Sequence, residues 1–205
     1  MWRTTDLDAP VTGSTGPSWA EIKEPLPSTD HRHLISAVSV SPVNSQVVWT
    51  GHNDGRLFRT TDAAAAKPAW AELDAGANPR LPKGRLVTRI VLHQPGARTI
   101  YVTFGGFERS NIWRSTDDGA TWRDVHGNMP PTPVFTVAIH PADSKVLYAA
   151  TELGLFTSLD GGASWRPERT GPANVSVQDL FWAGETLFAM THGRGAFKVD
   201  LSQRR

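Results

Sequence analysis

Three acidic residues have the type and position needed for hydrolytic chemistry, because each lies in a short bend between two apolar stretches. They are Asp54, Glu108 and Glu152. Two carboxyl groups held roughly 5–10 Å apart across a cleft can hydrolyse a glycosidic bond, one as acid and the other as base or nucleophile. Each can equally bind a sugar through hydrogen bonds, with a neighbouring aromatic ring as a stacking platform. The aromatic candidates are Trp49, Phe104 and Phe107.

A second group of polar residues forms a box that occurs twice, at Ser115–Trp122 and again 43 residues later at Ser158–Trp165. Both copies fit Ser/Thr-x-Asp-x-Gly-x-Ser/Thr-Trp. The Asp can accept hydrogen bonds from its own turn, the Gly can supply a positive φ, and the Trp carries a large apolar area. A calcium loop would need further oxygen ligands and a closing Glu. We therefore interpret the box as structural, with the residues Ser115, Asp117, Gly119, Thr121, Trp122, Ser158, Asp160, Gly162, Ser164 and Trp165.

The box lies within a longer repeat of four short strands, here called a to d. In the clearest unit we expect strands at Val134–His140, Val146–Thr151 and Leu155–Ser158, and a fourth that starts at Trp165. Four-stranded units repeated at this spacing are typical of a β-propeller, whose blades cover each other's apolar faces. We predict an all-β propeller of antiparallel blades, with units at 1–24 (partial), 35–74, 86–126, 134–169 and 175–200 (closing, partial).

The two ends of this array are incomplete, which gives about four to five blades. The chain opens with strands c and d only, and closes with strands a to c only. An open arc would expose two sheet edges and an apolar face. Three solutions are open: the strand at Trp19 completes the last blade, two chains assemble into one ring, or this chain is the C-terminal part of a larger propeller.

Composition limits the classes of partner. The chain has 21 Lys and Arg against 20 Asp and Glu, spread without a basic stripe, so we expect no nucleic-acid partner. It has no cysteine, and His31-Arg-His33, with two imidazoles on one side, lacks an evident third ligand, so we expect neither metal nor cofactor. Neither a signal peptide nor a membrane-spanning segment is evident in this chain. We expect a soluble chain, with its compartment undetermined.

The box and the residues around it resemble the Asp-box, or bacterial-neuraminidase-repeat, propellers, which include sialidases, xyloglucan-degrading hydrolases and sortilin-type receptors. His140-Pro141, Leu147–Thr151 and Gly154–Phe156 also resemble that family, over residues 35–200. The resemblance implies that ligands bind at the b–c bends and the connections between blades, away from the box. It implies the candidate binding residues His52, Asn53, Glu108, Arg109, Glu152, His192 and Arg194.

The same resemblance allows both enzymes and binding proteins. A sialidase would need a tyrosine nucleophile, but Tyr101 and Tyr148 fall at equivalent positions of successive repeats, which favours a packing role. Arg194 is also a candidate to pair with an acidic residue of a neighbouring blade. We therefore predict a non-catalytic module that binds a protein or a glycan on its b–c face. The alternative is a glycoside hydrolase, sialidase-like or xyloglucanase-like, or a fragment of one.

Overall fold

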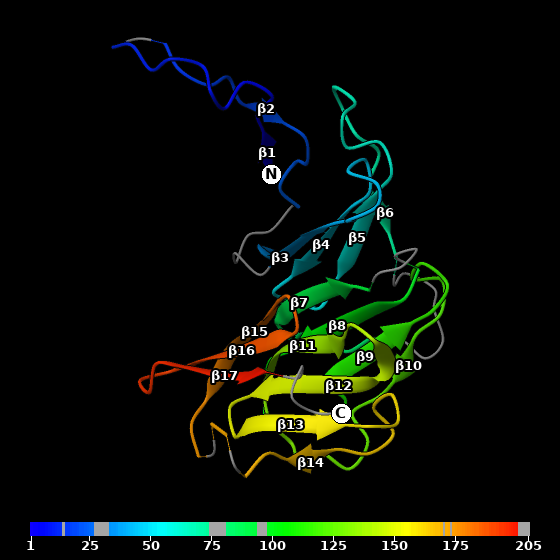
Figure 1. The fold of residues 1–205 in the computed structure, drawn as a ribbon. Coiled ribbons are helices and arrows are strands. Elements are labelled where there is room, and N and C mark those ends of the chain that lie inside the picture. The colour runs from blue at the N-terminus through cyan, green and yellow to red at the C-terminus, as the bar shows by residue number, and fades with distance from the viewer. Residues whose placement is uncertain are drawn as a thin grey trace.

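The computed structural model describes residues 1–13, 15–26, 33–73, 81–93, 98–169, 171–172 and 174–200, and every regular element in these ranges is a β-strand. The strands form three four-stranded antiparallel sheets, one three-stranded sheet and one two-stranded hairpin, as Figure 1 shows. The sheets follow one another as the blades of a partial β-propeller. The prediction of an all-β propeller is confirmed.

Each complete sheet is a meander in which neighbouring strands in the sequence are neighbours in space. The first blade contains β3 (Ile35–Val40), β4 (Val48–His52), β5 (Leu57–Thr60) and β6 (Ala71–Glu72). The second contains β7 (Val87–Leu92), β8 (Ile100–Phe104), β9 (Ile112–Ser115) and β10 (Arg123–Asp124). The third contains β11 (Val134–His140), β12 (Asp143–Thr151), β13 (Gly154–Ser158) and β14 (Arg166–Pro167).

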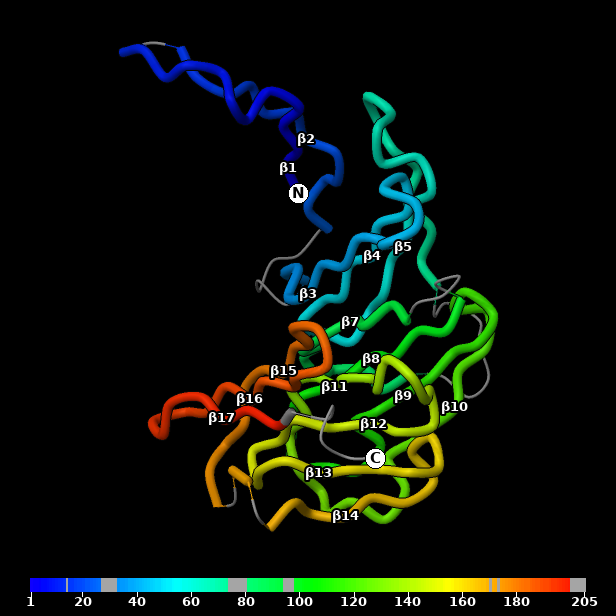
Figure 2. Tube along the Cα trace, viewed as in Figure 1, coloured from blue at the N-terminus to red at the C-terminus, as the bar shows by residue number. Residues whose placement is uncertain are grey.

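The array has a smaller sheet at each end. The terminal hairpin pairs β1 (Trp2–Arg3) with β2 (Ala20–Glu21), and the last blade contains β15 (Val177–Ala183), β16 (Thr186–Thr191) and β17 (Ala196–Asp200). Figure 2 shows the blue terminal hairpin and the red last blade on different sides of the first blade. The arc of blades is therefore open between them.

The fully buried strands of the chain lie where both faces of the sheet are covered. All five residues of β8 are buried, because the first and third blades pack on its two sides, and all five residues of β4 are buried as well. Buried side chains meet between successive blades in three clusters. Between the second and third blades, Ile112 and Val125 pack with Phe156 and Trp165. The core is thus a row of interfaces between blades, and each blade depends on its neighbours for burial.

The polar box closes the hairpin between β9 and β10 at the outer end of the blade. The Ser115 hydroxyl donates to Asp117 at 2.8 Å and accepts from the Gly119 amide at 2.8 Å. The Thr121 amide and hydroxyl both donate to the Asp117 carboxylate, at 2.9 and 2.6 Å. These hydrogen bonds, those from Thr121 foremost, lower the pKa of Asp117 to about 2. Gly119 has a φ of +84°, as this turn requires.

The same network recurs at three other hairpins, although their loops differ. Asp160 repeats every bond with Ser158, Gly162 and Ser164. In the terminal hairpin, Asp6 accepts from the Ser18 amide at 2.9 Å across a longer loop. In the first blade, Asp62 accepts from the Ala69 amide at 3.1 Å. The box therefore tolerates insertions in its loop, because its hydrogen bonds require only that the Asp carboxylate reach the backbone amide just before the Trp.

Candidate functional site

The opposite end of the blades carries the b–c bends, and a repeated backbone bond positions them. The first residue of each bend donates its amide to a carbonyl oxygen just before strand a of the same blade. The pairs are Asn53 to Leu34 (3.0 Å), Gly105 to Leu86 (2.9 Å), Glu152 to Pro133 (3.2 Å) and His192 to Ser176 (2.9 Å). Bends and incoming connections therefore form one continuous surface at this end.

The bends of the third and last blades meet in a groove of about 540 Å³, which we call the Glu152 groove. Three of the predicted site residues, Glu152, His192 and Arg194, line it together. The Ser176 hydroxyl donates to the Glu152 carboxylate at 3.0 Å, which fixes the direction of that side chain. The other lining residues are Asn174, Val175, Ser176, Gln178 and Gly193.

Two lining residues, Ser176 and Gln178, were not predicted from the sequence, because they lie at the polar start of a strand rather than in a bend or a charged connection. Gln178 donates to Ser176, so the two residues form a short polar chain that leads to Glu152. Their position in the sequence could have identified them, because both lie where the connection between blades leads into strand a. A polar residue at that point faces the same end of the blade as the bends.

Glu108 lies in the bend of the second blade and is paired with a cation. Its carboxylate, 61% exposed, accepts from Arg85 Nε at 3.0 Å. The same guanidinium donates to the Arg109 carbonyl oxygen at 2.7 Å and to Asn111 at 2.9 Å. Arg85 therefore holds the bend in shape, and Phe107 remains 69% exposed at its tip.

Asp54 is also bound by neighbouring side chains, Arg56 and His33, rather than presented to a substrate. It accepts from Arg56 Nε at 2.8 Å and pairs with His33 Nδ1 at 2.6 Å. Burial acts to raise the pKa of Asp54, but hydrogen bonds from Arg56 and His33 outweigh it, so the pKa lies below its usual value. A carboxyl group of this kind stays ionised, which does not fit a proton donor.

One expectation for the bend of the first blade is corrected. His52 was a candidate for binding, but its ring is only 1% exposed and packs edge-on against Phe58, with centroids 5.1 Å apart. Its Nδ1 donates to the His33 carbonyl oxygen at 2.9 Å, and burial lowers its pKa. His52 is therefore part of the blade interior. Asn53 accepts from the Leu34 amide at 3.0 Å, so it joins the bend to the connection.

The aromatic candidates also differ from expectation. Trp49 and Phe104 are buried at 1% and 0% exposure, because both belong to the interface between the first and second blades. Neither can stack on a ligand. Phe107 is the candidate that reaches solvent, and Leu153, 50% exposed, does so from the next bend. Within the described b–c bends, exposed large apolar surface therefore comes from these two side chains.

The described residues contain no group of three or more His, Asp or Glu side chains arranged to hold a metal ion. His31 and Arg32 lie outside those residues, and His33 pairs with Asp54. In the same part of the chain, no helix is long and apolar enough to cross a membrane. No second candidate carboxylate, Asp54 or Glu108, lines the Glu152 groove.

Comparison with known proteins gives a consistent architecture. No family model matches the chain. A xyloglucanase of Hypocrea jecorina is 22% identical over 192 residues, which are 87% of this chain and 22% of that protein. The GH74 xyloglucanase of Xanthomonas campestris superposes with a TM-score of 0.65 at 16% identity, over 91% of this chain and 32% of that one. This chain shares their propeller fold.

Two further solved structures extend the likeness. The GH74 enzyme of Niastella koreensis superposes with a TM-score of 0.62 at 13% identity, over 82% of this chain and 29% of that chain. A structure described as YCF48 bound to D1 peptide gives 0.56 at 12% identity, over 90% and 62%. The chain spans less than a third of the xyloglucanases that it matches. At these identities the likeness shows the fold.

Proposed function

We propose that this chain is part of a glycoside-hydrolase propeller of the xyloglucanase type, and that its Glu152 groove binds a glucan chain. One observation carries the proposal: the groove brings Glu152, His192 and Arg194 together from two successive bends. The xyloglucanase relatives support the substrate class, because they share the fold. This favours the glycoside-hydrolase alternative of the sequence analysis over an unrelated binding module.

The chemistry of the groove suits a neutral sugar chain. Glucose hydroxyl groups both donate and accept hydrogen bonds, so a carboxylate that accepts and a guanidinium that donates can hold adjacent hydroxyls. Glu152 and Arg194 supply these groups, and Ser176 holds Glu152 in place at 3.0 Å. Gly193, with a φ of +87° and no atom of the described residues within 4 Å of a would-be Cβ, leaves room for a sugar to approach the backbone.

The neighbouring bends extend this surface in the direction of the second blade. Leu153 and Phe107 are exposed on the bends of the third and second blades, and apolar side chains of this kind contact the flat faces of sugar rings. A chain of several glucose units would then contact three successive bends. We infer that the ligand is a polysaccharide rather than a monosaccharide.

The groove does not contain a pair of carboxylates for hydrolysis. Hydrolysis by two carboxyl groups needs both at the scissile bond. Among the described residues, Glu152 is the acidic side chain of the groove, while Asp54 is bound by Arg56 and Glu108 by Arg85. We therefore propose that these residues bind the glucan and that the second carboxylate of the whole enzyme comes from elsewhere.

The test is binding of xyloglucan oligosaccharides to the 205-residue chain by isothermal titration calorimetry, with reducing-sugar release measured in parallel. We expect binding without turnover, and a loss of about tenfold in affinity for Glu152→Gln and for Arg194→Ala, because each removes about 1.4 kcal/mol of hydrogen bonding. Glu185→Gln is the matched control, since Glu185 is exposed in the turn between β15 and β16 at the other end of the blade.

Three results would contradict this proposal. Absence of binding at millimolar oligosaccharide would reject the glucan ligand. Binding of an extended peptide that competes at the groove would favour a protein ligand instead. Hydrolysis that Glu152→Gln abolishes would show that the chain contains a complete catalytic pair.

A further inference from the structure

The terminal hairpin docks on the first blade through an indole hydrogen bond. An equivalent bond joins two complete blades. Trp165 Nε1 of the third blade donates to the Val125 carbonyl oxygen of the second at 2.9 Å. Trp70 Nε1 of the first blade donates to the Ile22 carbonyl oxygen at 2.7 Å. Val125 stands three residues after its box Trp, and Ile22 stands three residues after Trp19. β2 therefore occupies the place of a fourth strand in a preceding blade.

Two further contacts support this equivalence. Arg59 of strand c donates to the Asp118 carbonyl oxygen in the box of the next blade at 3.0 Å. Arg3, at the same position of β1, donates to the Ala63 carbonyl oxygen, the residue after Asp62. Lys23 also lies over the Phe58 ring at 4.1 Å from its centroid. The hairpin is therefore seated as half of a blade, with the positions of strands a and b next to it unfilled by any described residue.

The last blade has the complementary arrangement. It contains strands a, b and c, and no described strand pairs with the outer edge of β17. Beside that edge, between the third and last blades, is a hollow of about 190 Å³. Its lining includes Tyr148, Leu155, Glu168, Leu187, Ala189 and Phe197.

This hollow is equivalent to the site that Trp165 fills between the second and third blades, but no described tryptophan fills it. Trp165 lies among six residues of the second and third blades that hold the equivalent repeat positions: Tyr101, Ile112, Val125, Leu147, Ala149 and Phe156. The amide of Glu168 donates to Leu155 at 2.8 Å, as the amide of Val125 donates to Ile112 at 3.0 Å. The Glu168 carbonyl oxygen therefore stands where a tryptophan Nε1 would find its acceptor.

Among the described residues, the box tryptophan of the terminal hairpin is the most exposed of its kind. Trp19, just before β2, is 56% exposed, whereas Trp122 and Trp165 are each 2% exposed. The sheet faces beside the opening are also uncovered. Val38 and Val40 of the first blade are 51% and 52% exposed, and Phe181 and Met190 of the last blade are 46% and 40% exposed.

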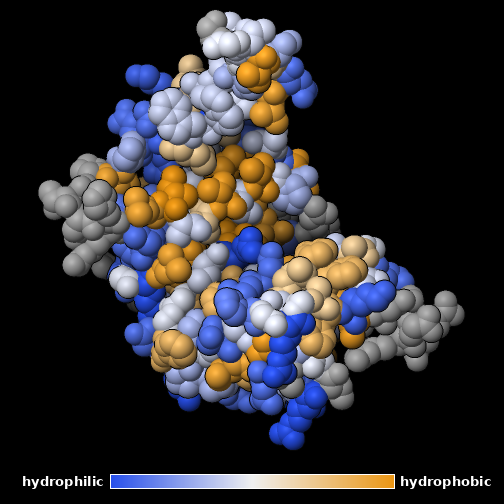
Figure 3. Space-filling view, turned by 90° about the vertical axis from the view of Figure 1, so that its left-hand side faces the viewer, coloured by the Kyte–Doolittle hydropathy of each residue, from blue (hydrophilic) through white to orange (hydrophobic). Residues whose placement is uncertain are grey.

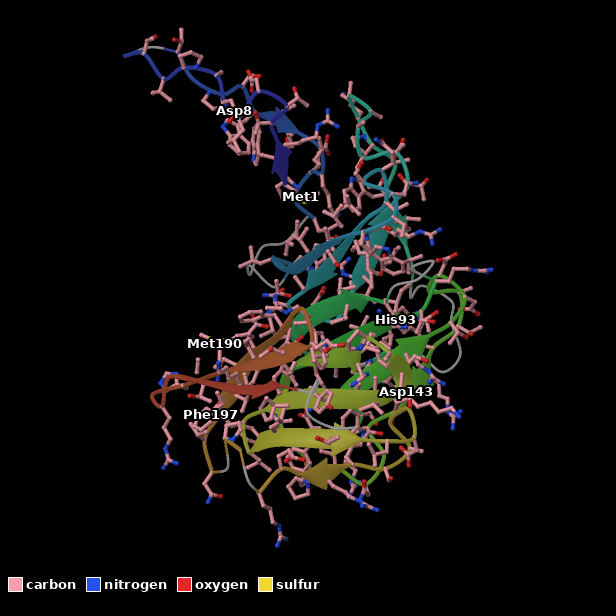
Figure 4. The ribbon with its side chains drawn as sticks, in the orientation of Figure 1. Met1, Asp8, His93, Asp143, Met190 and Phe197 are labelled. Carbon is pink, nitrogen blue, oxygen red and sulfur yellow. The ribbon has the colours of Figure 1, made fainter. Side chains whose placement is uncertain are left out.

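Figures 3 and 4 show this part of the molecule from two directions, as a surface and as side chains. Figure 3 views the molecule from the side of the last blade, where orange apolar surface reaches the solvent. Figure 4 labels Met190 and Phe197 on the neighbouring strands β16 and β17, and Met1 on the separate hairpin. The Phe181 and Phe188 rings stack with centroids 5.1 Å apart, which gives the last blade a flat apolar face.

We propose that two copies of this chain close one ring, in which the last blade of each copy takes β2 of the other as its fourth strand. β17 of one copy replaces β1 beside β2 of its partner, and Trp19 of the partner enters the hollow. The apolar face of the last blade then covers Val38 and Val40 of the partner's first blade. Each junction completes a four-stranded blade, so the ring contains eight, within the range of closed propellers.

The register of this junction follows from the hairpin. β1 pairs Trp2 with Glu21 and Arg3 with Ala20, and Phe197 and Lys198 hold the same repeat positions in β17. We expect Phe197 opposite Glu21 and Lys198 opposite Ala20. The exchange keeps the docking of β2 through Trp70 and Ile22. It displaces β1 together with Met1, so β17 must replace the bonds that these residues make with Ile22, Lys23 and Ala63. In return, a second copy removes two exposed edges.

The first experiment uses the absence of cysteine from the chain. Ala20→Cys and Lys198→Cys are prepared as separate variants, mixed and oxidised, because cross-strand partners lie close enough for a disulfide. We expect a disulfide-linked heterodimer from the mixture and none from either variant alone. Absence of the cross-link in the mixture, or a native mass of one chain at micromolar concentration, would overturn the proposal.

The second experiment compares two exposed tryptophans of the same hairpin by analytical ultracentrifugation. Trp19→Ala should raise the dimer dissociation constant at least tenfold, because it empties the hollow at both junctions. Trp2→Ala, which removes a side chain that is 60% exposed on the displaced strand, should change the constant less than twofold. Equal effects of the two substitutions would contradict the exchange and indicate nonspecific apolar association.

Discussion

Arg89 Nη2 of β7 and Asp179 Oδ1 of β15 lie 2.7 Å apart, although the whole third blade separates their strands in the chain. Both belong to the inner strands, which with β3 and β11 line a groove of about 790 Å³ along the axis of the arc. The ion pair therefore spans the second and last blades across this groove. It is a direct consequence of the curvature that the blades impose.

We expect this pair to contribute little to stability. The two side chains are 43% and 44% exposed, so water and salt screen their attraction. Arg89→Ala should lower the free energy of unfolding, measured by urea denaturation, by less than about 1 kcal/mol. A loss above about 2 kcal/mol would show that the curvature of the arc depends on the pair rather than on apolar packing.

The indole hydrogen bond between blades should be measurable by comparing two tryptophans. Trp165 and Trp122 are equally buried, but Trp165 Nε1 donates to Val125, whereas Trp122 Nε1 has no partner among the described residues. Trp165→Phe should therefore cost about 1 kcal/mol more than Trp122→Phe, because it leaves the Val125 carbonyl oxygen unpaired. Chemical denaturation of both variants tests this, and equal losses would exclude a specific role for the bond.

The close approach of the first two blades should depend on one glycine. A Cβ added at Gly51 of β4 would lie 2.3 Å from Val87 Cγ1, within the packed interface. Gly51→Ala should destabilise the chain by about 1–3 kcal/mol, since the blades must separate to admit the methyl group. Gly105→Ala is the control, because the nearest atom there is 3.6 Å away. A neutral Gly51→Ala in thermal unfolding would contradict this packing.

Stability should fall with decreasing pH in two separate ranges. Burial lowers the pKa of His52 and of His126 below the ordinary 6.5. Because the unfolded chain takes up these protons first, stability is complete above pH 6.5 and decreases below it. Protonation is costly in the fold, since His126 Nδ1 accepts from the Asn111 amide at 3.4 Å and His52 Nε2 is buried with no hydrogen-bond partner among the described residues.

The second range belongs to the box aspartates. Hydrogen bonds lower the pKa of Asp117 and Asp160 from 3.8 to about 2, so their contribution is complete above pH 3.8 and is lost towards pH 2. Circular dichroism melts from pH 8 to pH 2 should show both decreases in the midpoint temperature. Asp160→Asn should weaken only the lower one, and a midpoint independent of pH between 8 and 5 would refute the role of the histidines.

Much of the architecture followed from local sequence. The alternation of apolar residues and the spacing of the box predicted strands such as Val134–His140, which the structure reproduces as β11. Strand b was expected from Val146, but β12 begins at Asp143, because the turn continues the pairing of His140 with Asp143. Local propensity sets these elements, since each box closes its own hairpin with bonds inside a few residues.

The candidate site was only partly predictable. The bends themselves could be located, and Glu152, His192 and Arg194 do share one groove. His52 was misjudged, because burial of a bend residue depends on the neighbouring blade, here through Phe58. The pairing of Asp54 with His33 was not predictable either, because the two residues are 21 positions apart in the sequence.

The sequence alone therefore determined the class of fold, the repeat and the structural box, because these depend on contacts within one hairpin or one blade. The tertiary structure decided which bends meet, which carboxylates are paired with cations, and where a tryptophan site is left empty beside β17. Those properties arise from packing between blades, where residues about 40 positions apart, such as Trp165 and Val125, come into contact. The sequence of a single blade does not show which neighbour such a residue contacts, or whether the site for it is filled.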